Sequence, residues 1–376
     1  MTRNEAASDT LVIGGGVVGA ALAWGLARAG ERVTVLDDGD IVLRASRGNF
    51  GLVWVQSKGA NMFDYARWTR RSADLWPEFA AMIGDETGLD LAYEKPGGIH
   101  FMLSETELEA ARARNFAMKD VTGPDDYGAE IVDRHELDKI FPGLGPDVIG
   151  GSYGHHDGHV NPLKLLRGLH LAMEARGVRY VSNARVESVT KDGAGFTAET
   201  AKGRFSAAKV VLAAGHGTTE LAPALGLDMP LRPEKGQILV TERCATRLLP
   251  MPTHVLRQTD EGTVLIGDSH ENTGYSTASY TPVLTDIARH ALRCFPALAA
   301  LKVVRSWGCV RVLSPDGCPV YHASETCPGA FAIACHSGVT LAAAHAMELA
   351  GVIASGSFGD RFAAFHPRRF SHAQAH

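Results

Sequence analysis

A glycine-rich turn near the N-terminus restricts the fold more than any other feature of this sequence. The apolar run at residues 11–13 leads into Gly-Gly-Gly-Val-Val-Gly at 14–19, and a helical pattern continues to about residue 29. Gly14, Gly16 and Gly19 therefore hold the positions of a G-x-G-x-x-G motif between a strand and a helix. The first glycine permits a tight turn, the second lets a pyrophosphate approach, and the third lets the helix pack on the strand. The segment predicts a βαβ unit that binds a dinucleotide at the helix N-terminus.

A second apolar run, 33–36, ends at Asp37, about 20 residues beyond the turn. An acid at this place suits a ribose hydroxyl, whereas an arginine would suit a 2′-phosphate, so NADP is disfavoured. The glycine motif alone leaves an NAD-dependent dehydrogenase as an alternative, and a glycine turn without a ligand is the structural alternative.

Composition excludes several classes of protein. The chain has 376 residues, enough for two domains, and its net charge of −5 offers no cationic surface for nucleic acid or an anionic membrane. Polar residues interrupt the longest apolar stretch, 330–354, so no transmembrane segment is expected. The six cysteines form no C-x-x-C pair, which argues against a disulfide framework, a zinc site or an iron–sulfur cluster. We expect a cytoplasmic protein without a metal site.

Periodicity predicts further helices at 65–83, 104–119 and from Asn161-Pro162 to Gly177, and strands at 99–102, 179–181, 185–189, 196–199 and 209–214. The run 209–214 has the composition of a buried strand that stops at Gly215. We find no internal repeat and no long linker. Two segments, before about residue 150 and at about 220–316, interrupt the nucleotide-binding pattern, so both domains are expected to be discontinuous.

Several motifs in order resemble the FAD-dependent oxidoreductases of the D-amino-acid oxidase, glycine oxidase and sarcosine oxidase type. They are the N-terminal glycine motif, Ala-Ser-Arg-Gly-Asn-Phe-Gly at 45–51, Val-Leu-Ala-Ala-Gly at 211–215, Pro-Glu-Lys-Gly-Gln at 233–237, Trp-Gly-Cys-Val-Arg at 307–311 with Ser-Pro-Asp-Gly at 314–317, and His-Ser-Gly-Val-Thr-Leu at 336–341. The resemblance implies an α/β fold (α+β overall), in which a Rossmann-like FAD-binding domain (1–85, 150–220 and 317–376) carries an inserted substrate domain (86–149 and 221–316) built on a mostly antiparallel sheet.

Within that superfamily, residues 46–54 and 335–340 look most like the flavin-bearing B or β subunits of opine oxidases and D-hydroxyproline dehydrogenases. The resemblance implies oxidation of the C–N bond of D-hydroxyproline, a D-amino acid or an opine by hydride transfer to flavin N5, with hydrolysis of the imine. It also implies an oligomer with partner subunits that carry electron-transfer cofactors. Two alternatives stay open: an oxygen-using oxidase of the glycine or sarcosine oxidase type, and a non-catalytic FAD scaffold subunit.

The resemblance also assigns residues to the cofactor. Glycines of the turn would hold the FAD pyrophosphate, Asp37 the ribose and Val186 the adenine, and backbone N–H groups at the start of the last motif would meet the flavin's pyrimidine edge. The full expected set is Ile13, Gly14, Gly16, Val17, Val18, Gly19, Asp37, Asp38, Arg44, Ala45, Ser46, Asn49, Gly51, Leu52, Val186, Ala214, Gly215, Gly338, Val339 and Thr340.

Arg311 is the first candidate for substrate recognition, because a guanidinium can hold an α-carboxylate in a bidentate manner. Arg257 is a candidate for the second carboxylate of an opine, with Arg305 a weaker one, and Trp54 and His100 are further candidates to line the substrate pocket. His336, beside the flavin motif, is the candidate catalytic histidine that tunes the amine proton. A structural role is the alternative for each of these residues.

The same resemblance guides the interpretation of three further features: Cys309, the histidines at 155–159, and Leu265. Cys309 falls where some sarcosine oxidases attach FAD covalently, but we expect a non-covalent cofactor. His155, His156, Asp157 and His159 have ligand chemistry, yet adjacent histidines on a loop rarely converge on one metal. Leu265 stands where sarcosine oxidases carry a lysine that promotes reaction with oxygen, so a dehydrogenase is favoured over an oxidase.

Overall fold

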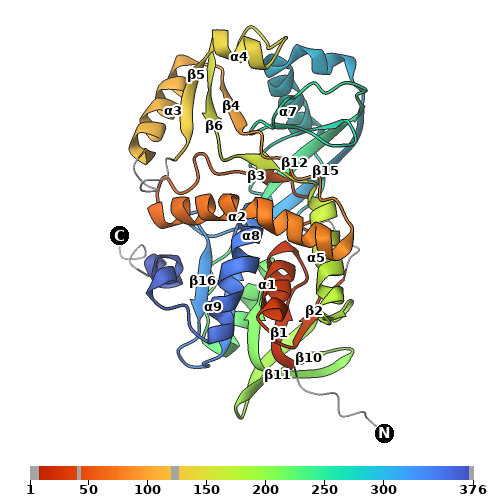
Figure 1. The fold of residues 1–376 in the computed structure, drawn as a ribbon, viewed down its shortest axis with the longest axis vertical. Helices are drawn as coiled ribbons and strands as arrows, with labels where there is room; N and C mark the ends of the chain where they lie inside the picture. Colours follow the sequence, from red (N-terminus) through yellow and green to blue (C-terminus); the bar gives the residue numbers. More distant parts are fainter. Residues whose placement is uncertain (1–7, 40–43, 120–126, 372–376) are drawn as a thin grey trace.

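A central sheet organises the lower part of the molecule in Figure 1. The computed structural model describes residues 8–39, 44–119 and 127–371. Five parallel strands run in the order β8-β2-β1-β11-β17, and β16 pairs antiparallel with β17. Their bounds are β1 (Ser8–Ile13), β2 (Val33–Leu36), β8 (Arg179–Val181), β11 (Gly203–Leu212), β16 (Val320–Ala323) and β17 (Ala330–Ala334). This is the Rossmann-like arrangement that the glycine turn predicts, and the α/β fold class is confirmed.

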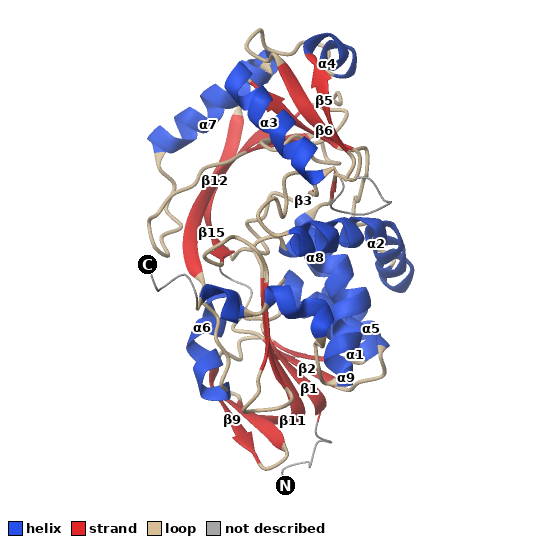
Figure 2. Ribbon diagram, turned by 90° about the vertical axis from the view of Figure 1, so that its left-hand side faces the viewer, coloured by secondary structure: helices blue, strands red, loops and turns tan. Residues whose placement is uncertain are grey.

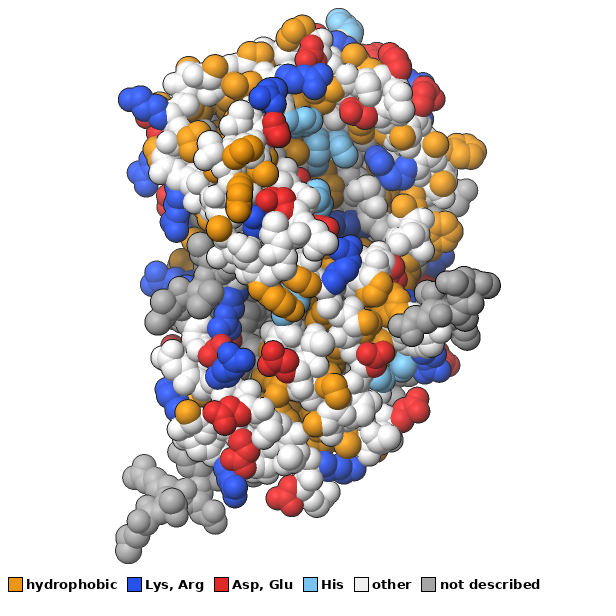
Figure 3. All heavy atoms as spheres, turned by 180° about the vertical axis from the view of Figure 1, so that it is seen from behind, with side chains coloured by type: hydrophobic (Ala, Val, Ile, Leu, Met, Phe, Trp, Pro, Cys, Tyr) orange, Lys and Arg blue, Asp and Glu red, His pale blue; other side chains and the backbone are white. Residues whose placement is uncertain are grey.

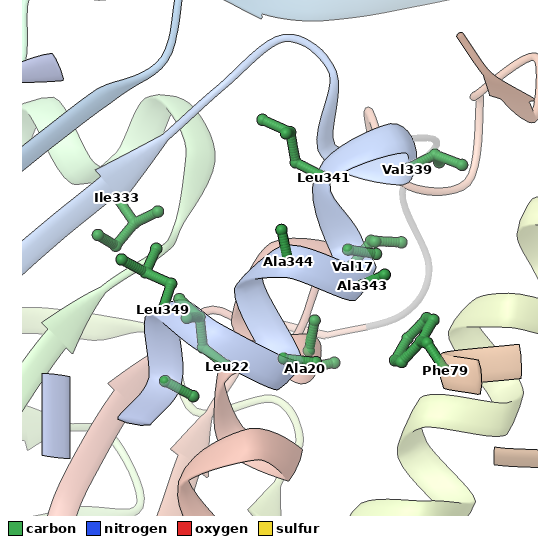
Figure 4. Packing of buried hydrophobic residues seen from close by; sticks show 14 of the residues in the cluster. Val17, Ala20, Leu22, Phe79, Ile333, Val339, Leu341, Ala343, Ala344 and Leu349 are labelled. Carbon is green, nitrogen blue, oxygen red and sulfur yellow. The ribbon is translucent and has the colours of Figure 1, made fainter. Parts of the chain in front are cut away.

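One face of this sheet is covered by helices. They are α1 (Val17–Arg28), α2 (Phe63–Thr87), α5 (Pro162–Ala175) and a C-terminal run of α8 (Gly338–Ala344), the π-helical η4 (His345–Leu349) and α9 (Ala350–Ser355). Figure 4 shows the packing: Val17 of α1 lies beside Ala343 and Ala344 of α8, and Leu22 lies beside Leu349. The small residues on both helices let their backbones approach closely, which fixes the first and last motifs of the sequence beside each other.

The opposite face is covered by an antiparallel meander. The first half of β11 pairs with β10 (Gly195–Thr200), which pairs in turn with β9 (Val186–Asp192). A second hydrophobic cluster lies between this meander, the central sheet and the short elements η1 (Gly215–Gly217), α6 (Thr218–Leu221) and η2 (Ala222–Leu225). The buried strand predicted at 209–214 is thus the second half of a longer strand.

Two antiparallel sheets form the upper part. One has the order β4 (Gly98–Met102), β6 (Gly150–Gly154), β5 (Ala129–Asp133), and the other β13 (Leu256–Gln258), β14 (Thr263–Ile266), β12 (Arg232–Arg243), β15 (Val303–Leu313). Their helices are α3 (Glu105–Met118), α4 (Arg134–Ile140), α7 (Thr281–Cys294) and η3 (Pro296–Ala300). A third hydrophobic cluster joins β4, β5, α4, β12, β13, β14, α7 and η3, and a small fourth cluster packs α3 against β4. Figure 2 shows the curved pair β12–β15 reaching down beside the lower part.

The expected domain boundary at residue 150 divides one of these sheets. Strand β6 begins at Gly150 and pairs on both sides with β4 and β5, so its hydrogen bonds belong to the upper part. The short pair β3 (Leu52–Val53) and β7 (Gly158–His159) then joins the two parts. The sequence gives no sign of this strand because β6, Gly-Gly-Ser-Tyr-Gly, lacks the β-branched residues that mark a strand.

Local capping explains why several helices begin where the sequence predicts. The side chain of Asn161 accepts from the N–H groups of Leu163 and Lys164 at 3.2 Å, and Pro162 occupies the first turn of α5. Ser104 caps α3 in the same way, accepting from Glu107 N at 3.3 Å. The chain closes with η5 (Asp360–Phe365) and η6 (Pro367–Phe370).

Among the described residues, one helical stretch, Gly338–Ser355, is long and apolar enough to cross a membrane. It comprises α8, η4 and α9, and 61% of it is buried inside the fold against α1 and α2. Its apolar surface is therefore used in packing the central domain.

Candidate active site

A cavity of about 650 Å³ opens at the carboxyl ends of β1, β2 and β11, within the range of volumes that hold cofactors. The expected residues that line it are Ile13, Gly14, Gly16, Val17, Val18, Asp37, Asp38, Arg44, Ala45, Ser46, Asn49, Val186, Ala214, Gly215, His336, Gly338 and Val339. Eight expected residues are not in its lining: Gly19, Gly51, Leu52, Thr340, Arg311, His100, Trp54 and Arg257. Segments from both ends of the chain thus meet in one hollow.

The glycine turn has the geometry that its motif requires. Gly14 has φ +107°, and a Cβ there would lie 2.5 Å from the carbonyl oxygen of Ala213. A Cβ at Gly19 would lie 1.9 Å from the carbonyl oxygen of Gly14, so this position sets the contact between helix and turn rather than the cavity wall. His170, which the sequence did not single out, fixes the turn through a 2.7 Å hydrogen bond between Nε2 and Gly15 O.

Asp37 is buried at the rim of the cavity. Its Oδ2 accepts from Gly15 N at 2.7 Å and its Oδ1 from Gly39 N at 2.8 Å. A carboxylate has about four lone-pair sites, so each oxygen keeps one for a ligand hydroxyl. The two backbone bonds orient the carboxylate for that purpose.

Ser46 connects a distant loop to the start of α1. Its Oγ accepts from Val17 N at 2.9 Å, which satisfies one of the free N–H groups of the first turn. Its hydroxyl proton can then be donated into the cavity. The adjacent Asn49 holds its own loop through Oδ1, which accepts from Gly51 N at 2.7 Å.

The last motif forms the opposite wall. The Ser337 hydroxyl accepts from Tyr65 OH at 2.7 Å, and among the described side chains none caps the first turn of α8. The N–H groups of Gly338 and Val339 therefore lie in the cavity wall without a side-chain cap. Thr340 instead ties α8 to β3, because its Oγ1 accepts from Trp54 N at 3.1 Å and donates to Leu52 O at 3.3 Å.

Arg311 is held by acidic neighbours. Its Nη2 lies 2.9 Å from Asp268 Oδ2, and its Nη1 donates to Ser269 O at 2.7 Å and lies 3.3 Å from Glu234 Oε1. Its side chain packs over Gly236, where a Cβ would lie 2.3 Å from Nη2. Two carboxylates thus already neutralise the guanidinium expected to receive the substrate.

Arg257 has the opposite environment. It is 3% exposed, and its guanidinium has no hydrogen bond or ion pair with any residue that the structure describes. Burial lowers the pKa of Arg257 to about 10, which leaves it charged at neutral pH. Asp260, whose charge acts on it, is paired with Lys164 at 2.6 Å. The Cζ atom lies 3.2 Å from where a Cβ would stand on Gly51, so Arg257 borders the loop expected along the flavin.

The two candidate histidines lie in different places. His336 lines the cavity, and burial, with the charges of Lys58 and Arg311, holds its pKa well below 6.5, so the ring is neutral. His100 stacks on His254 with ring centroids 3.6 Å apart, and burial lowers its pKa to about 4. Figure 3 shows histidine side chains gathered in a recess of the upper part. The described contacts of His100 are with this group rather than with His336.

Trp54, also expected at the substrate, is 6% exposed, and its ring lies against Gly98 of β4, where a Cβ would be 2.5 Å from Cζ3. Cys309 packs closely on Gly48, because a Cβ added to Gly48 would lie 2.5 Å from Cys309 Sγ. Burial raises the pKa of the Cys309 thiol to about 11. A protonated thiol is a poor nucleophile. The structure thus gives the cysteine a packing contact.

Leu265 of β14 is directly opposite Arg257 in the register of β13 and β14. Opposed residues of an antiparallel pair point to the same face. Arg257 on β13 therefore places a cation beside Leu265, the position where sarcosine oxidases carry a lysine.

The histidines at residues 155–159 point to different partners. His155 Nε2 lies 3.1 Å from Glu130, whereas His159 lies 3.9 Å from Glu94. Within the described ranges, no three His, Cys, Asp or Glu side chains are placed to hold a metal ion.

Some residues of the site gave no clear signal in the sequence. His216 and Tyr275 line the cavity with their rings 5.1 Å apart, and His216 Nε2 lies 2.9 Å from Arg311 O. His216 directly follows the motif at 211–215, so its neighbours in the sequence could have indicated it. Tyr275 comes from a loop of the upper part that carries no local pattern.

Comparison with known proteins identifies the family. The model described as DAO, FAD dependent oxidoreductase, matches residues 9–352. The chain belongs to this family of FAD-dependent oxidoreductases. It is 45% identical over 367 residues to the opine oxidase B subunit of Rhizobium meliloti, covering 98% of this chain and 99% of that one. It is 46% identical to the opine oxidase B subunit of Agrobacterium tumefaciens (strain Ach5), covering 97% and 98%.

Among solved structures, glycine oxidase from Geobacillus kaustophilus superposes on this flavoenzyme with a TM-score of 0.88. The two chains are 23% identical, with 96% and 98% coverage, which shows a shared fold.

The residues of the cavity fit the family's cofactor. The turn admits no Cβ at Gly14, Asp37 keeps acceptor sites for a diol, and the first residues of α8, which no described side chain caps, line the cavity. This flavoenzyme thus has a cavity that fits FAD between its first and last motifs.

Proposed function

We propose that this enzyme oxidises the C–N bond of an amino acid or secondary amine, with opines as the preferred substrates over D-hydroxyproline and other D-amino acids. Bound FAD supplies the chemistry by accepting a hydride from the substrate carbon at N5, which leaves an imine that water hydrolyses to a carbonyl compound and an amine. The observation that carries the proposal is Arg257, a buried cation without a counter-ion among the described residues, beside the loop expected along the flavin.

An opine is a secondary amine with a carboxylate on each side, and it needs more cationic contacts than a simple amino acid. A buried guanidinium without a partner is unfavourable unless an anion joins it. A carboxylate of the substrate would complete the five-donor fork of Arg257. The two opine oxidase relatives, each at least 45% identical over nearly the whole chain, support this class.

We propose that His336 accepts a hydrogen bond from the substrate amine. It lines the cavity, and burial keeps its imidazole neutral, so that one ring nitrogen is an acceptor. A neutral amine is required for hydride loss from the neighbouring carbon, so this contact would set the protonation state of the bound substrate.

We further propose that the chain is the catalytic subunit of a cytoplasmic dehydrogenase complex, and that electrons leave through partner subunits with electron-transfer cofactors. Each of the two opine oxidase relatives is one subunit of its enzyme, which supports an assembly. The leucine at 265, in place of a lysine, supports an acceptor other than oxygen.

One observation favours a second candidate, an oxygen-using oxidase. The guanidinium of Arg257 points from the same sheet face as Leu265, and a cation there would stabilise charge that develops on reduced oxygen. Admitting oxygen to the reduced enzyme separates the two: slow reoxidation supports the dehydrogenase, and rapid reoxidation with peroxide supports the oxidase.

The role of Arg257 is tested by comparing substrates with one and two carboxylates. Arg257→Met should raise the KM for octopine at least tenfold and that for D-proline less than threefold, measured with an artificial electron acceptor. Arg305→Met is the matched control, because Arg305 stacks on Trp307 5.5 Å away on β15. Equal changes for octopine and D-proline in Arg257→Met would contradict the second-carboxylate role.

A further inference from the structure

A turn at residues 54–65 encloses the start of α8. Trp54 N donates to Thr340 Oγ1 at one end of the turn, at 3.1 Å, and Tyr65 OH donates to Ser337 Oγ at the other, at 2.7 Å. Between these points the backbone N–H of Lys58 donates to Val55 O at 3.1 Å. The turn is thus fixed against the segment that follows β17 and lines the cavity.

Lys58 lies in the middle of this turn and was not singled out from the sequence. Its side chain is half-buried, and its ammonium has no hydrogen bond or ion pair with the residues that the structure describes. Burial and the charge of Arg311 lower the pKa of Lys58, and the charge of Lys58 in turn helps to lower that of His336. The turn that carries Lys58 is also bonded, through Tyr65, to Ser337, the residue directly after His336.

The acidic groups around Lys58 have other partners. Asp157 Oδ1 accepts from the N–H groups of Val55 at 2.6 Å and Gln56 at 3.2 Å, and its Oδ2 accepts from Gln56 Nε2 at 2.6 Å. Burial raises the pKa of Asp157 to about 7, so it is only partly ionised at neutral pH. Asp157 is not within ion-pair distance of Lys58.

Arg311 and Lys58 thus differ in what they can offer an anion. Arg311 lies between Glu234 and Asp268 and is already neutralised, whereas Lys58 is a cation without a counter-ion in the described ranges. A half-buried charge in this condition is unfavourable until an anion joins it. Lys58 is absent from the cavity lining, to which His336 belongs.

We infer that Lys58 binds a carboxylate of the substrate, and that Arg311 serves mainly to hold the β12–β15 sheet and the loop at Asp268. The inference deepens the proposed function and rests on it. Together with Arg257, which borders Gly51 just before β3, Lys58 gives this part of the chain two cations without acidic partners among the described residues. An amine that carries two carboxylates is the substrate class that matches this pair.

The test uses the holoenzyme and a ligand that cannot be oxidised. Benzoate and acetate are titrated separately while the flavin absorption spectrum is followed, with benzamide as the uncharged comparison. Lys58→Met should weaken binding of the anions at least tenfold without changing that of benzamide, and Lys58→Arg should stay within about threefold of wild type. Lys95→Met is the control, because Lys95 is a lysine whose ammonium already has an acidic neighbour, Asp74, 3.8 Å away.

Several outcomes would overturn the inference. Anion binding unchanged in Lys58→Met, a tenfold loss in Arg311→Met alone, or a wild-type spectrum that neither anion perturbs would each contradict it. Loss of FAD from Lys58→Met would assign the lysine to the cofactor instead. Since ligand binding needs no turnover, these results are independent of whether any amine reduces the flavin, which is the test of the proposed function itself.

Discussion

At the scale of single residues, Asp157 is the buried acid that joins the upper and lower parts. Its carboxylate holds the turn at residues 55–56, and Gln56 passes the connection on to β4 through a 3.1 Å bond to Gly98 O. The side chain is fully buried, and burial raises its pKa to about 7 against an ordinary 3.8. The folded protein therefore binds a proton here more tightly than the unfolded chain does.

This shift predicts a pH dependence of stability with a definite sign. Because the folded pKa is raised, the contribution of Asp157 to folding is fully present below pH 4 and is lost as pH rises to about 7. The loss is at most roughly 4 kcal/mol, at about 1.4 kcal/mol per pKa unit. Asp157→Asn should therefore gain stability relative to wild type between pH 4 and pH 7, measured by urea unfolding.

The comparison between the two proteins cancels the buried histidines, whose lowered pKa values give the opposite dependence. Asp192→Asn, at the exposed end of β9, is the control and should show no such trend. A difference between Asp157→Asn and wild type that does not vary with pH would mean that Asp157 is ionised throughout.

At the scale of elements, the contact between α1 and the C-terminal helices sets the shape of the cavity. A Cβ at Gly25 of α1 would lie 2.2 Å from the carbonyl oxygen of Ala346 in η4 and 2.6 Å from the Cβ of Ala350. The two helices thus touch through backbone. This contact positions Gly338 opposite the glycine turn, where a Cβ on Gly338 would lie 3.2 Å from Val18.

Replacing Gly25 with alanine should therefore lower the free energy of unfolding by about 1–3 kcal/mol through overpacking, in spite of alanine's better helix propensity. Gly351→Ala in α9 is the matched control, because no atom lies within 4 Å of its added Cβ. It should be neutral or stabilising by up to about 1 kcal/mol. Thermal unfolding of the two variants measures both, and equal effects would contradict a backbone contact at Gly25.

Elements with strong local patterns were predictable. The sequence locates α1 and β2 within one residue and β1 within three, and the Asn161-Pro162 cap gives the start of α5. Strand β6 was not recognised because its glycines carry no propensity. The environment of Arg311 and Arg257 depends on strands that lie far along the chain from the FAD motifs, and no local pattern reveals which cation meets a carboxylate.

At the scale of the whole molecule, the predicted substrate sites lie where the two parts meet. The central sheet has hydrophobic clusters on both faces, the upper sheets share a third, and β3 with β7 lies between them. Figure 2 shows β15, the strand that carries Arg311, descending toward the level of α8. The proposed cofactor residues thus come mainly from the lower part, and the proposed substrate cations come from the junction.

The central claim is that this chain alone oxidises an amine with its own FAD. The most direct measurement is the visible spectrum of the purified chain without oxygen, before and after separate additions of octopine, nopaline, D-hydroxyproline, D-proline and sarcosine. The account predicts a yellow protein whose flavin band is bleached by at least one of them, the opines first. A yellow protein that none of them bleaches would contradict a catalytic role on these amines and support a scaffold subunit.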